Sequence, residues 1–201
     1  MIYLASRSPR RRELLAQIDV RFHLLLFREQ PRRPPDVDET PLEGEAADGY
    51  VQRLARLKAE VAWRRMLQRR LAPAPVLSAD TTVTLGGRIL GKPADRADAA
   101  AMLAMLSGTT HEVLTAVALK DRDVLESALS RSAVTFKRLS EEEIGRYVAS
   151  GECDDKAGAY GIQGRAARFV VELRGSYSGV MGLPLYETAE LLAAHERRNP
   201  R

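Results

Sequence analysis

The sequence predicts an α/β protein with a mixed β-sheet. Short apolar runs that suit buried strands are interspersed with longer segments whose apolar residues recur at helical spacing. The order of these segments does not follow a strict strand–helix–strand repeat, which favours a mixed sheet over an all-parallel one. With 201 residues, 45% of them hydrophobic, the chain is long enough for one substantial domain or two small lobes that share a sheet.

The first half of the chain is expected to hold two short strands, two helices and a hairpin. Ser8 and Pro9 are suited to the N-cap and the first position of the first helix, and Gly86-Gly87 to the turn of the hairpin. In chain order we expect strands at 2–5 and 20–27 around a helix over 9–17, a proline-rich surface loop over 28–44, a helix over 45–71, and a strand, turn and strand over 76–93.

The second half is expected to alternate again between helices and strands. Asp95 and Ser140 read as N-caps, and Ser140 with Glu143 forms a capping box. We expect a helix from Asp95 to Gly108, strands at 111–120 and 130–137, a helix from Ser140 to Gly151, short strands near 158–162 and 169–173, and a helix after Pro184. Residues 1–195 are predicted to form one domain and residues 196–201 a frayed tail.

Composition excludes several classes of protein. The 31 basic and 27 acidic residues give a net charge of +4, which permits an anionic ligand without demanding nucleic acid. Aromatic residues make up 5% and do not alternate with basic ones, so a single-strand-binding platform is not expected. The single cysteine, Cys153, excludes an intrachain disulfide and reads as a packing residue. No signal peptide or membrane span is recognisable, which predicts a cytoplasmic protein.

The start of the first helix carries an unusual charge. Arg10, Arg11 and Arg12 occupy its first turn, where the helix dipole already presents partial positive charge. Two interpretations compete. The arginines are solvated surface residues, or they clamp an anion bound at the free backbone N–H groups.

Other segments add candidate residues, each ambiguous alone. Asp80 interrupts a β-favouring run, which indicates a strand end, a bulge or a working carboxylate. Lys58 lies at the edge of an apolar helix stripe and either snorkels outward or points into a cleft. The segment Gly86 to Lys92 has the spacing of a P-loop but ends in proline, so we reject that motif and keep Lys92 as an oriented cation.

Two further regions carry polar groups. Asp36, Asp38 and Glu39 place carboxylates in the proline-rich loop, where they are usually solvated. Around Lys156 and Gln163 small residues cluster, which permits either tight turns or close approach of a flat ligand. His111 is interpreted as a packing or hydrogen-bonding residue. Taken together, arginines, lysines and isolated carboxylates are the equipment for cleaving a phosphoanhydride with a divalent metal.

These motifs form a recognisable series. LASRSPRRRELL, DVDET, SADTTV, GKP, LSGTTHEV, DKAGAYGIQG and GLPLYET resemble, in order, the signatures of the Maf family of nucleoside triphosphate pyrophosphatases. The resemblance implies an elongated α/β fold with two lobes around a cleft, similar to that of inosine triphosphate pyrophosphatases, and frequent homodimerisation. It also implies hydrolysis of a nucleoside triphosphate to the monophosphate and pyrophosphate with Mg²⁺ or Mn²⁺, without a membrane or stable nucleic acid as partner.

The resemblance also implies roles for individual residues. Asp80 stands at the position of the catalytic proton acceptor and, with Glu39, at a metal position. Substrate binding is implied for Ser6, Arg10, Arg11, Lys58, Thr81, Lys92, Lys156 and Gln163.

The pattern at the specificity positions points to one branch of the family. Arg10, Thr81 and Gln163 match the dTTP/UTP branch, and the tryptophan and glutamine of the 7-methylguanosine triphosphate branch are missing. Arg7 departs from the small residue common in the family, and the additional prolines before DVDET loosen the register of that loop. Members are associated with septum formation, so the alternative is a nucleotide-binding regulator of division with little turnover.

Overall fold

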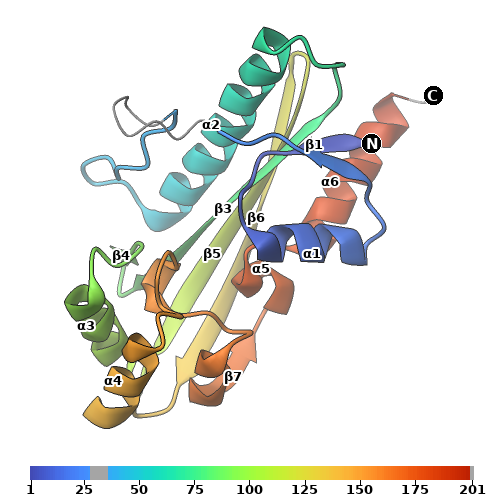
Figure 1. Ribbon diagram of the computed structural model, residues 1–201. Coiled ribbons are helices and arrows are strands. Elements are labelled where there is room, and N and C mark those ends of the chain that lie inside the picture. The colour runs from blue at the N-terminus through green and yellow to red at the C-terminus, as the bar shows by residue number, and fades with distance from the viewer. Residues whose placement is uncertain (28–35, 200–201) are drawn as a thin grey trace.

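The structure, a computed structural model, describes residues 1–27 and 36–199 and consists of a seven-stranded mixed sheet with helices on both faces (Figure 1). Six strands follow the order β2-β1-β3-β5-β6-β7, and β4 pairs with β3 off this path. β1 is parallel to β2 and β3, and the remaining pairings are antiparallel. The predicted fold class is therefore confirmed.

The elements occur in an order close to the predicted one. The strands are β1 (Ile2–Leu4), β2 (Phe22–Leu24), β3 (Val76–Leu85), β4 (Arg88–Leu90), β5 (Thr110–Asp121), β6 (Val124–Phe136) and β7 (Val170–Arg174). The helices are α1 (Pro9–Gln17), α2 (Ala47–Gln68), α3 (Arg96–Leu106), α4 (Glu141–Ala149), α5 (Tyr177–Met181) and α6 (Leu185–Arg198), with short 3₁₀ turns η1 (Ala157–Ala159) and η2 (Arg165–Phe169).

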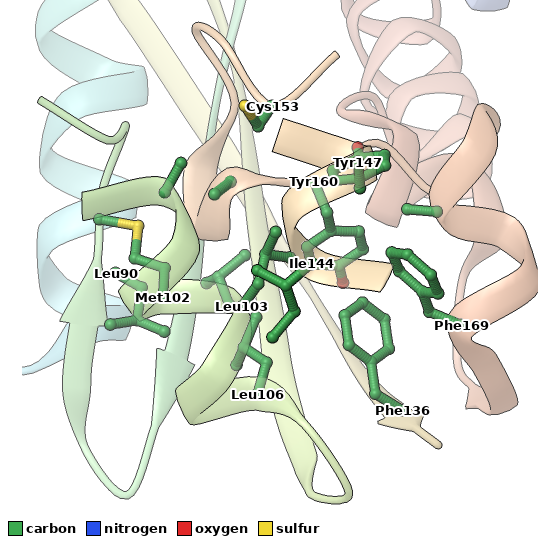
Figure 2. Close-up of a cluster of buried hydrophobic side chains, with 14 of the residues drawn as sticks. Leu90, Met102, Leu103, Leu106, Phe136, Ile144, Tyr147, Cys153, Tyr160 and Phe169 are labelled. Atoms are coloured by element: carbon green, nitrogen blue, oxygen red, sulfur yellow. The ribbon is translucent and has the colours of Figure 1, made fainter. Parts of the chain in front are cut away.

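The long strands β3, β5 and β6 join two lobes, as Figure 1 shows. In one lobe α2 covers one face of the sheet and α1 and α6 cover the other, with separate apolar clusters on each side. In the second lobe α3, α4 and the segment after α4 enclose the largest apolar cluster, drawn in Figure 2. Its centre is aromatic: Phe136 packs edge-on against Tyr160 at 4.8 Å between ring centroids. The elongated, two-lobed shape is thus built on shared strands.

Strand β3 is partly unpaired on one side, and this positions the candidate site. β1 pairs with it at Val76 and Leu77, and β4 pairs with it from Val83 onward. Within the described residues, 78–82 therefore have β5 on one edge and no strand on the other. Asp80 lies in this stretch in regular register with Ala116 of β5. Asp80 stands neither at a strand end nor at a bulge. Of the three interpretations, a functional carboxylate is the one that remains.

Several expected boundaries need correction. The strand predicted over 20–27 is limited to Phe22–Leu24, and the helix predicted over 45–71 covers Ala47–Gln68. β6 begins at Val124, six residues before the expected start at 130. The last helix continues to Arg198 and so includes three residues of the expected tail 196–201. Residues 28–35 of the predicted loop lie outside the described residues.

The strand predicted near 158–162 is wrong. Gly158 and Ala159 both adopt positive φ, 65° and 60°, so the backbone turns through the left-handed region instead of running extended. A Cβ on Gly158 would lie 2.9 Å from a methyl group of Val83, so the segment approaches β3 closely. Helix α5 was not predicted, because its five residues are too few to show an apolar period.

His111 and Cys153 have the packing roles that were predicted from the sequence. The buried His111 hydrogen-bonds the Tyr160 hydroxyl through Nε2 at 2.8 Å and packs edge-on against Phe136. Burial lowers the pKa of His111 to about 4, which keeps the ring neutral near pH 7. Cys153 is fully buried in the same cluster. Among the helices of the described residues, none is both long and apolar enough to cross a bilayer.

Candidate active site

All ten predicted site residues line one cleft. It has a volume of about 1030 Å³, just above the range of roughly 300–1,000 Å³ that small-molecule sites occupy. Its walls come from the start of α1, the unpaired stretch of β3, the first half of α2, the segment after β4, and the loop after α4. The residues brought together are Ser6, Arg10, Arg11, Glu39, Lys58, Asp80, Thr81, Lys92, Lys156 and Gln163.

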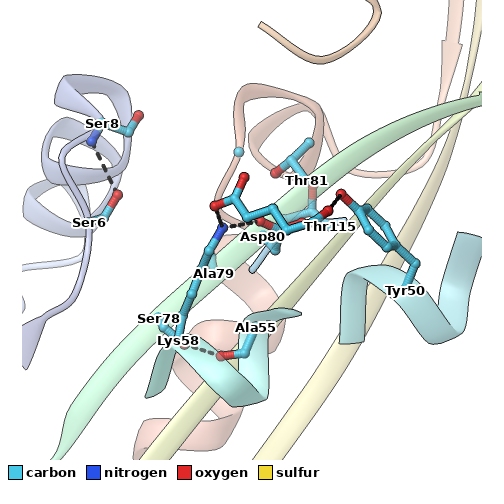
Figure 3. Close-up of polar contacts among 12 residues, drawn as sticks. Ser6, Ser8, Tyr50, Ala55, Lys58, Ser78, Ala79, Asp80, Thr81 and Thr115 are labelled. Atoms are coloured by element: carbon cyan, nitrogen blue, oxygen red, sulfur yellow. Dashed lines mark hydrogen bonds and ion pairs between the residues drawn. The ribbon is translucent and has the colours of Figure 1, made fainter. Parts of the chain in front are cut away.

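At the centre of the cleft, Lys58 lies between two carboxylates. Its Nζ donates to Oδ1 of Asp80 at 2.6 Å and forms an ion pair with Oε1 of Glu39 at 2.7 Å. Figure 3 shows the lysine reaching Asp80. Tyr50 donates its hydroxyl to the backbone carbonyl of Glu39 at 2.9 Å, which holds that residue beside α2. Of the two interpretations of Lys58, the structure selects the one that points into the cleft.

The electrostatic environment differs for the two acids. Burial raises the pKa of Asp80, and the nearby cations Lys58 and Arg11 only partly offset this effect. Burial acts on Glu39 in the same direction, but there Lys58, Lys92 and Arg11 outweigh it and lower the pKa. When two neighbouring carboxylates have opposite pKa shifts, the one with the raised pKa takes up a proton more readily and the other stays ionised.

The three arginines of α1 diverge in direction. Arg10 lines the cleft and has no hydrogen-bond or ion-pair partner among residues 1–27 and 36–199. The Arg11 guanidinium instead bonds three protein acceptors: the carbonyl of Gly182 at 2.7 Å through Nε, that of Ala79 at 2.7 Å through Nη1, and Thr81 Oγ1 at 3.3 Å through Nη2. Arg12 is not among the residues that line the cleft. Neither interpretation, solvated surface arginines or an anion clamp, therefore describes all three residues, because Arg11 has a structural role.

The backbone N–H groups at the start of α1 are mostly occupied. Ser8 caps the helix by accepting from the Arg11 N–H at 3.4 Å, and its own N–H donates to Ser6 Oγ at 3.2 Å (Figure 3). Pro9 has no N–H. Within the described part of the chain this leaves the N–H of Arg10, beside its own free guanidinium, as the first-turn donor without a protein acceptor.

The hydroxyl proton of Thr81 is used within the protein. Thr115 Oγ1 donates its single proton to the carbonyl of Gly179 at 2.7 Å. In the 3.0 Å contact between the two threonines, Thr81 must therefore be the donor. Since it also accepts from Arg11, Thr81 links Arg11 of α1 to Thr115 of β5, and its hydroxyl has no proton left for a ligand.

Lys156 and Gln163 enter the cleft from the loop after α4. Gln163 is exposed, whereas its neighbours Gly161 and Ile162 are buried. Among the described residues, the ammonium group of Lys156 makes a single long contact, of 3.5 Å, to the Asp154 carbonyl. Burial lowers the pKa of Lys156, and Arg10 adds to the effect, so the two cations act on the same region of the cleft. Lys92 is exposed and, among the described residues, makes no direct hydrogen bond or ion pair.

The acidic side chains of the cleft could supply only part of the ligand shell of a divalent cation. Within residues 1–27 and 36–199 no three acidic, histidine or cysteine side chains come together as a metal site. Glu39 and Asp80 nonetheless converge from two sides on one positive group, Lys58 Nζ. Carboxylate oxygens suit Mg²⁺, which is usually held by one or two carboxylates plus phosphates of the substrate. The residues present fit a metal that arrives with a polyphosphate.

The fold and the cleft together define an α/β protein with a cleft between two lobes, lined by polar and apolar groups, in which cations accompany a buried carboxylate. The family model for "Maf-like protein" matches residues 1–195. The chain belongs to the Maf family.

Curated relatives cover nearly the full length. The "dTTP/UTP pyrophosphatase" of Aromatoleum aromaticum is 61% identical over 192 residues, 95% of this chain and 93% of the relative. Those of Dechloromonas aromatica and Nitrosomonas europaea are 57% and 56% identical over 191 residues, again 95% of this chain and 95% and 92% of the relatives. Among solved structures, that of the Staphylococcus aureus Ham1 protein aligns with a TM-score of 0.43 and 18% identity over 70% of this chain and 72% of that one.

Sequence reasoning missed two residues that hold parts of the cleft in place, Tyr50 in its lining and Thr115 behind it. Thr115 is fully buried on β5 and reads as an ordinary strand threonine. Tyr50 reads as one more residue of an apolar helix stripe, yet its hydroxyl holds the backbone of Glu39. Their partners are distant in sequence, so no local pattern could have identified them.

Proposed function

We propose that this protein hydrolyses dTTP and UTP to the nucleoside monophosphate and pyrophosphate. The observation that carries the proposal is a buried carboxylate, Asp80, in the same cleft as three cations with few protein partners, Arg10, Lys92 and Lys156. Curated relatives with up to 61% identity are named for this reaction, which favours turnover over a regulator that only binds nucleotide. A polyphosphate is the ligand that separated cations of this kind would hold.

In the proposed mechanism Asp80 is the general base. One oxygen, Oδ1, is held by Lys58, and Oδ2 has no partner within the described residues. Oδ2 takes a proton from the water that attacks the α-phosphorus, and the bond to the bridging oxygen breaks to release pyrophosphate. Burial raises the pKa of Asp80 and so makes its carboxylate a stronger base than an exposed one. Lys58 keeps the carboxylate oriented.

The remaining residues bind and orient the substrate in this proposal. Arg10, Lys92 and Lys156 contact the phosphates, with the N–H of Arg10 and the hydroxyl of Ser6 at the start of α1. Arg11 and Thr81 keep the walls of the cleft together through their internal hydrogen bonds. A divalent cation, Mg²⁺ or Mn²⁺, held by Glu39 and Asp80, would neutralise phosphate charge.

Gln163 would read the base. A side-chain amide offers one donor group and one acceptor, which match the adjacent N–H and carbonyl of uracil or thymine. A site built to hydrogen-bond one edge rejects other bases, because a wrong base leaves polar groups unpaired.

The test is a panel of dTTP, UTP, CTP, ATP, GTP and 7-methylguanosine triphosphate with pyrophosphate release as the readout. We expect dTTP and UTP to have the highest kcat/KM. Gln163→Ala should lower the ratio of dTTP to GTP by about tenfold, the scale of one hydrogen bond lost to a base, and reduce the best kcat less. Gln68→Ala, an exposed glutamine at the end of α2, is the matched control. Preference for 7-methylguanosine triphosphate, or nucleotide binding without turnover, would contradict the proposal.

A further inference from the structure

The turn that carries Gln163 is held at both ends by α4 and the turn that follows it. The N–H of Gly164 donates to the carbonyl of Gly161 at 3.1 Å, so residues 161–164 form a turn. At its start, the N–H of Gly161 donates to the hydroxyl of Tyr147 at 3.2 Å. Just beyond its end, the N–H of Arg165 donates to the carboxylate of Glu152, at 2.8 Å to Oε1 and 3.1 Å to Oε2.

The two anchoring side chains are bonded to each other. The Tyr147 hydroxyl accepts from Gly161 and donates to Oε1 of Glu152 at 3.3 Å. Tyr147 belongs to α4, is fully buried and packs edge-on against Phe169, with 5.4 Å between ring centroids (Figure 2). The pair therefore connects the turn to the apolar core of the second lobe, which is the least mobile support available to a loop.

The glycines at the two ends leave room for these contacts. A Cβ on Gly164 would lie 2.0 Å from Oε1 of Glu152, so the carboxylate occupies the space of a side chain. A Cβ on Gly161 would lie 2.9 Å from Cε of Lys156, so the stem of the lysine runs against that glycine. Lys156 and Gln163, two of the residues by which this loop lines the cleft, are thus carried by a backbone that Tyr147 and Glu152 hold.

We propose that Tyr147 and Glu152 are positioning residues that set base specificity through the Gln163 turn. Neither lines the cleft, so neither touches a nucleotide directly. A fixed turn presents the Gln163 amide in one place, where it can pair with one base edge and leave another unpaired. A loose turn lets the amide follow several bases. This inference rests on the proposed function, since it concerns the same substrates.

The experiment compares Tyr147→Phe and Glu152→Ala with the wild type in kcat/KM for dTTP and GTP. Each variant removes one anchor, and the phenylalanine retains the ring packing. We expect the dTTP to GTP ratio to fall by about tenfold, the equivalent of roughly one hydrogen bond, with a smaller change in kcat for dTTP. Glu143→Ala is the matched control, because it removes a carboxylate that caps the same helix without touching the turn. Its dTTP to GTP ratio should equal that of the wild type.

A double variant separates positioning from general destabilisation. If Glu152 acts through Gln163, then Glu152→Ala combined with Gln163→Ala is no less selective than Gln163→Ala alone. Additive losses, or unchanged selectivity in both single variants, would overturn the inference. Amide hydrogen exchange of residues 156–165 should also accelerate in Glu152→Ala, and unchanged protection there would count against it. Failure of the wild type to hydrolyse any nucleoside triphosphate would instead refute the proposed function, and this is read before any variant.

Discussion

Asp80→Asn is expected to lower kcat for dTTP hydrolysis by about two or more orders of magnitude, the usual contribution of a general base. Asparagine keeps the size of the side chain and an oxygen that can accept from Lys58, but it cannot take a proton from water. Pyrophosphate release under saturating substrate measures the effect. Asp123→Asn makes the same chemical change on an exposed turn residue and should leave kcat unaltered.

The stability of the same variant distinguishes a functional acid from a structural one. Burial raises the pKa of Asp80 above its ordinary value of 3.8, so its ionised form is disfavoured in the folded protein relative to the unfolded chain. At neutral pH the carboxylate therefore costs stability, and this cost disappears as the pH falls through the raised pKa. We expect Asp80→Asn to unfold at pH 7 at no lower temperature than the wild type. A clear loss of stability with near-normal kcat would show that Asp80 is structural.

Lys58→Met is expected to have the second largest effect, on both rate and pH dependence. The methionine leaves Glu39 and Asp80 facing each other without the ammonium group that bonds both at 2.6–2.7 Å. Removing one partner of a buried ion pair costs about 3 kcal/mol or more, part of which protonation of Asp80 relieves. We expect kcat/KM at pH 7 to fall by at least about tenfold, which corresponds to roughly 1.4 kcal/mol.

The pH profile of Lys58→Met shows in which direction the lysine shifts the pKa of Asp80. Loss of the cation raises the pKa of Asp80 further, so the acidic limb of kcat/KM should move to higher pH than in the wild type. Lys58→Arg preserves the charge and should keep the limb near its original position. A limb that does not move in the methionine variant would mean that Asp80 is not the group whose ionisation limits the rate.

Local signals predicted most of the fold, because several helices of this chain begin at a recognisable N-cap residue. Ser140 with Glu143 and Asp95 with Asp98 both form the side-chain caps expected from their sequence. The errors fall where conformation depends on distant contacts. Ala159 adopts a φ of 60° because its segment packs against β3, and nothing in the letters around it indicates a left-handed residue.

The candidate site was predicted as a set of residues but not as an arrangement. Motif resemblance placed all ten residues, and the structure brings them into one cleft. The sequence could not show that adjacent residues of a motif have different roles. Arg10 and Arg11 are adjacent on α1, and helical geometry turns them about 100° apart, so one faces the open cleft and the other reaches carbonyl groups of Ala79 and Gly182.

The site of bond cleavage is the central claim, and isotope labelling tests it most directly. Hydrolysis of dTTP in water enriched with ¹⁸O transfers one oxygen atom from water to the phosphorus that is attacked. If Asp80 directs water to the α-phosphorus, mass spectrometry will find one ¹⁸O in dTMP and none in the pyrophosphate. Label in the pyrophosphate, or release of orthophosphate as the first product, would contradict the proposed reaction.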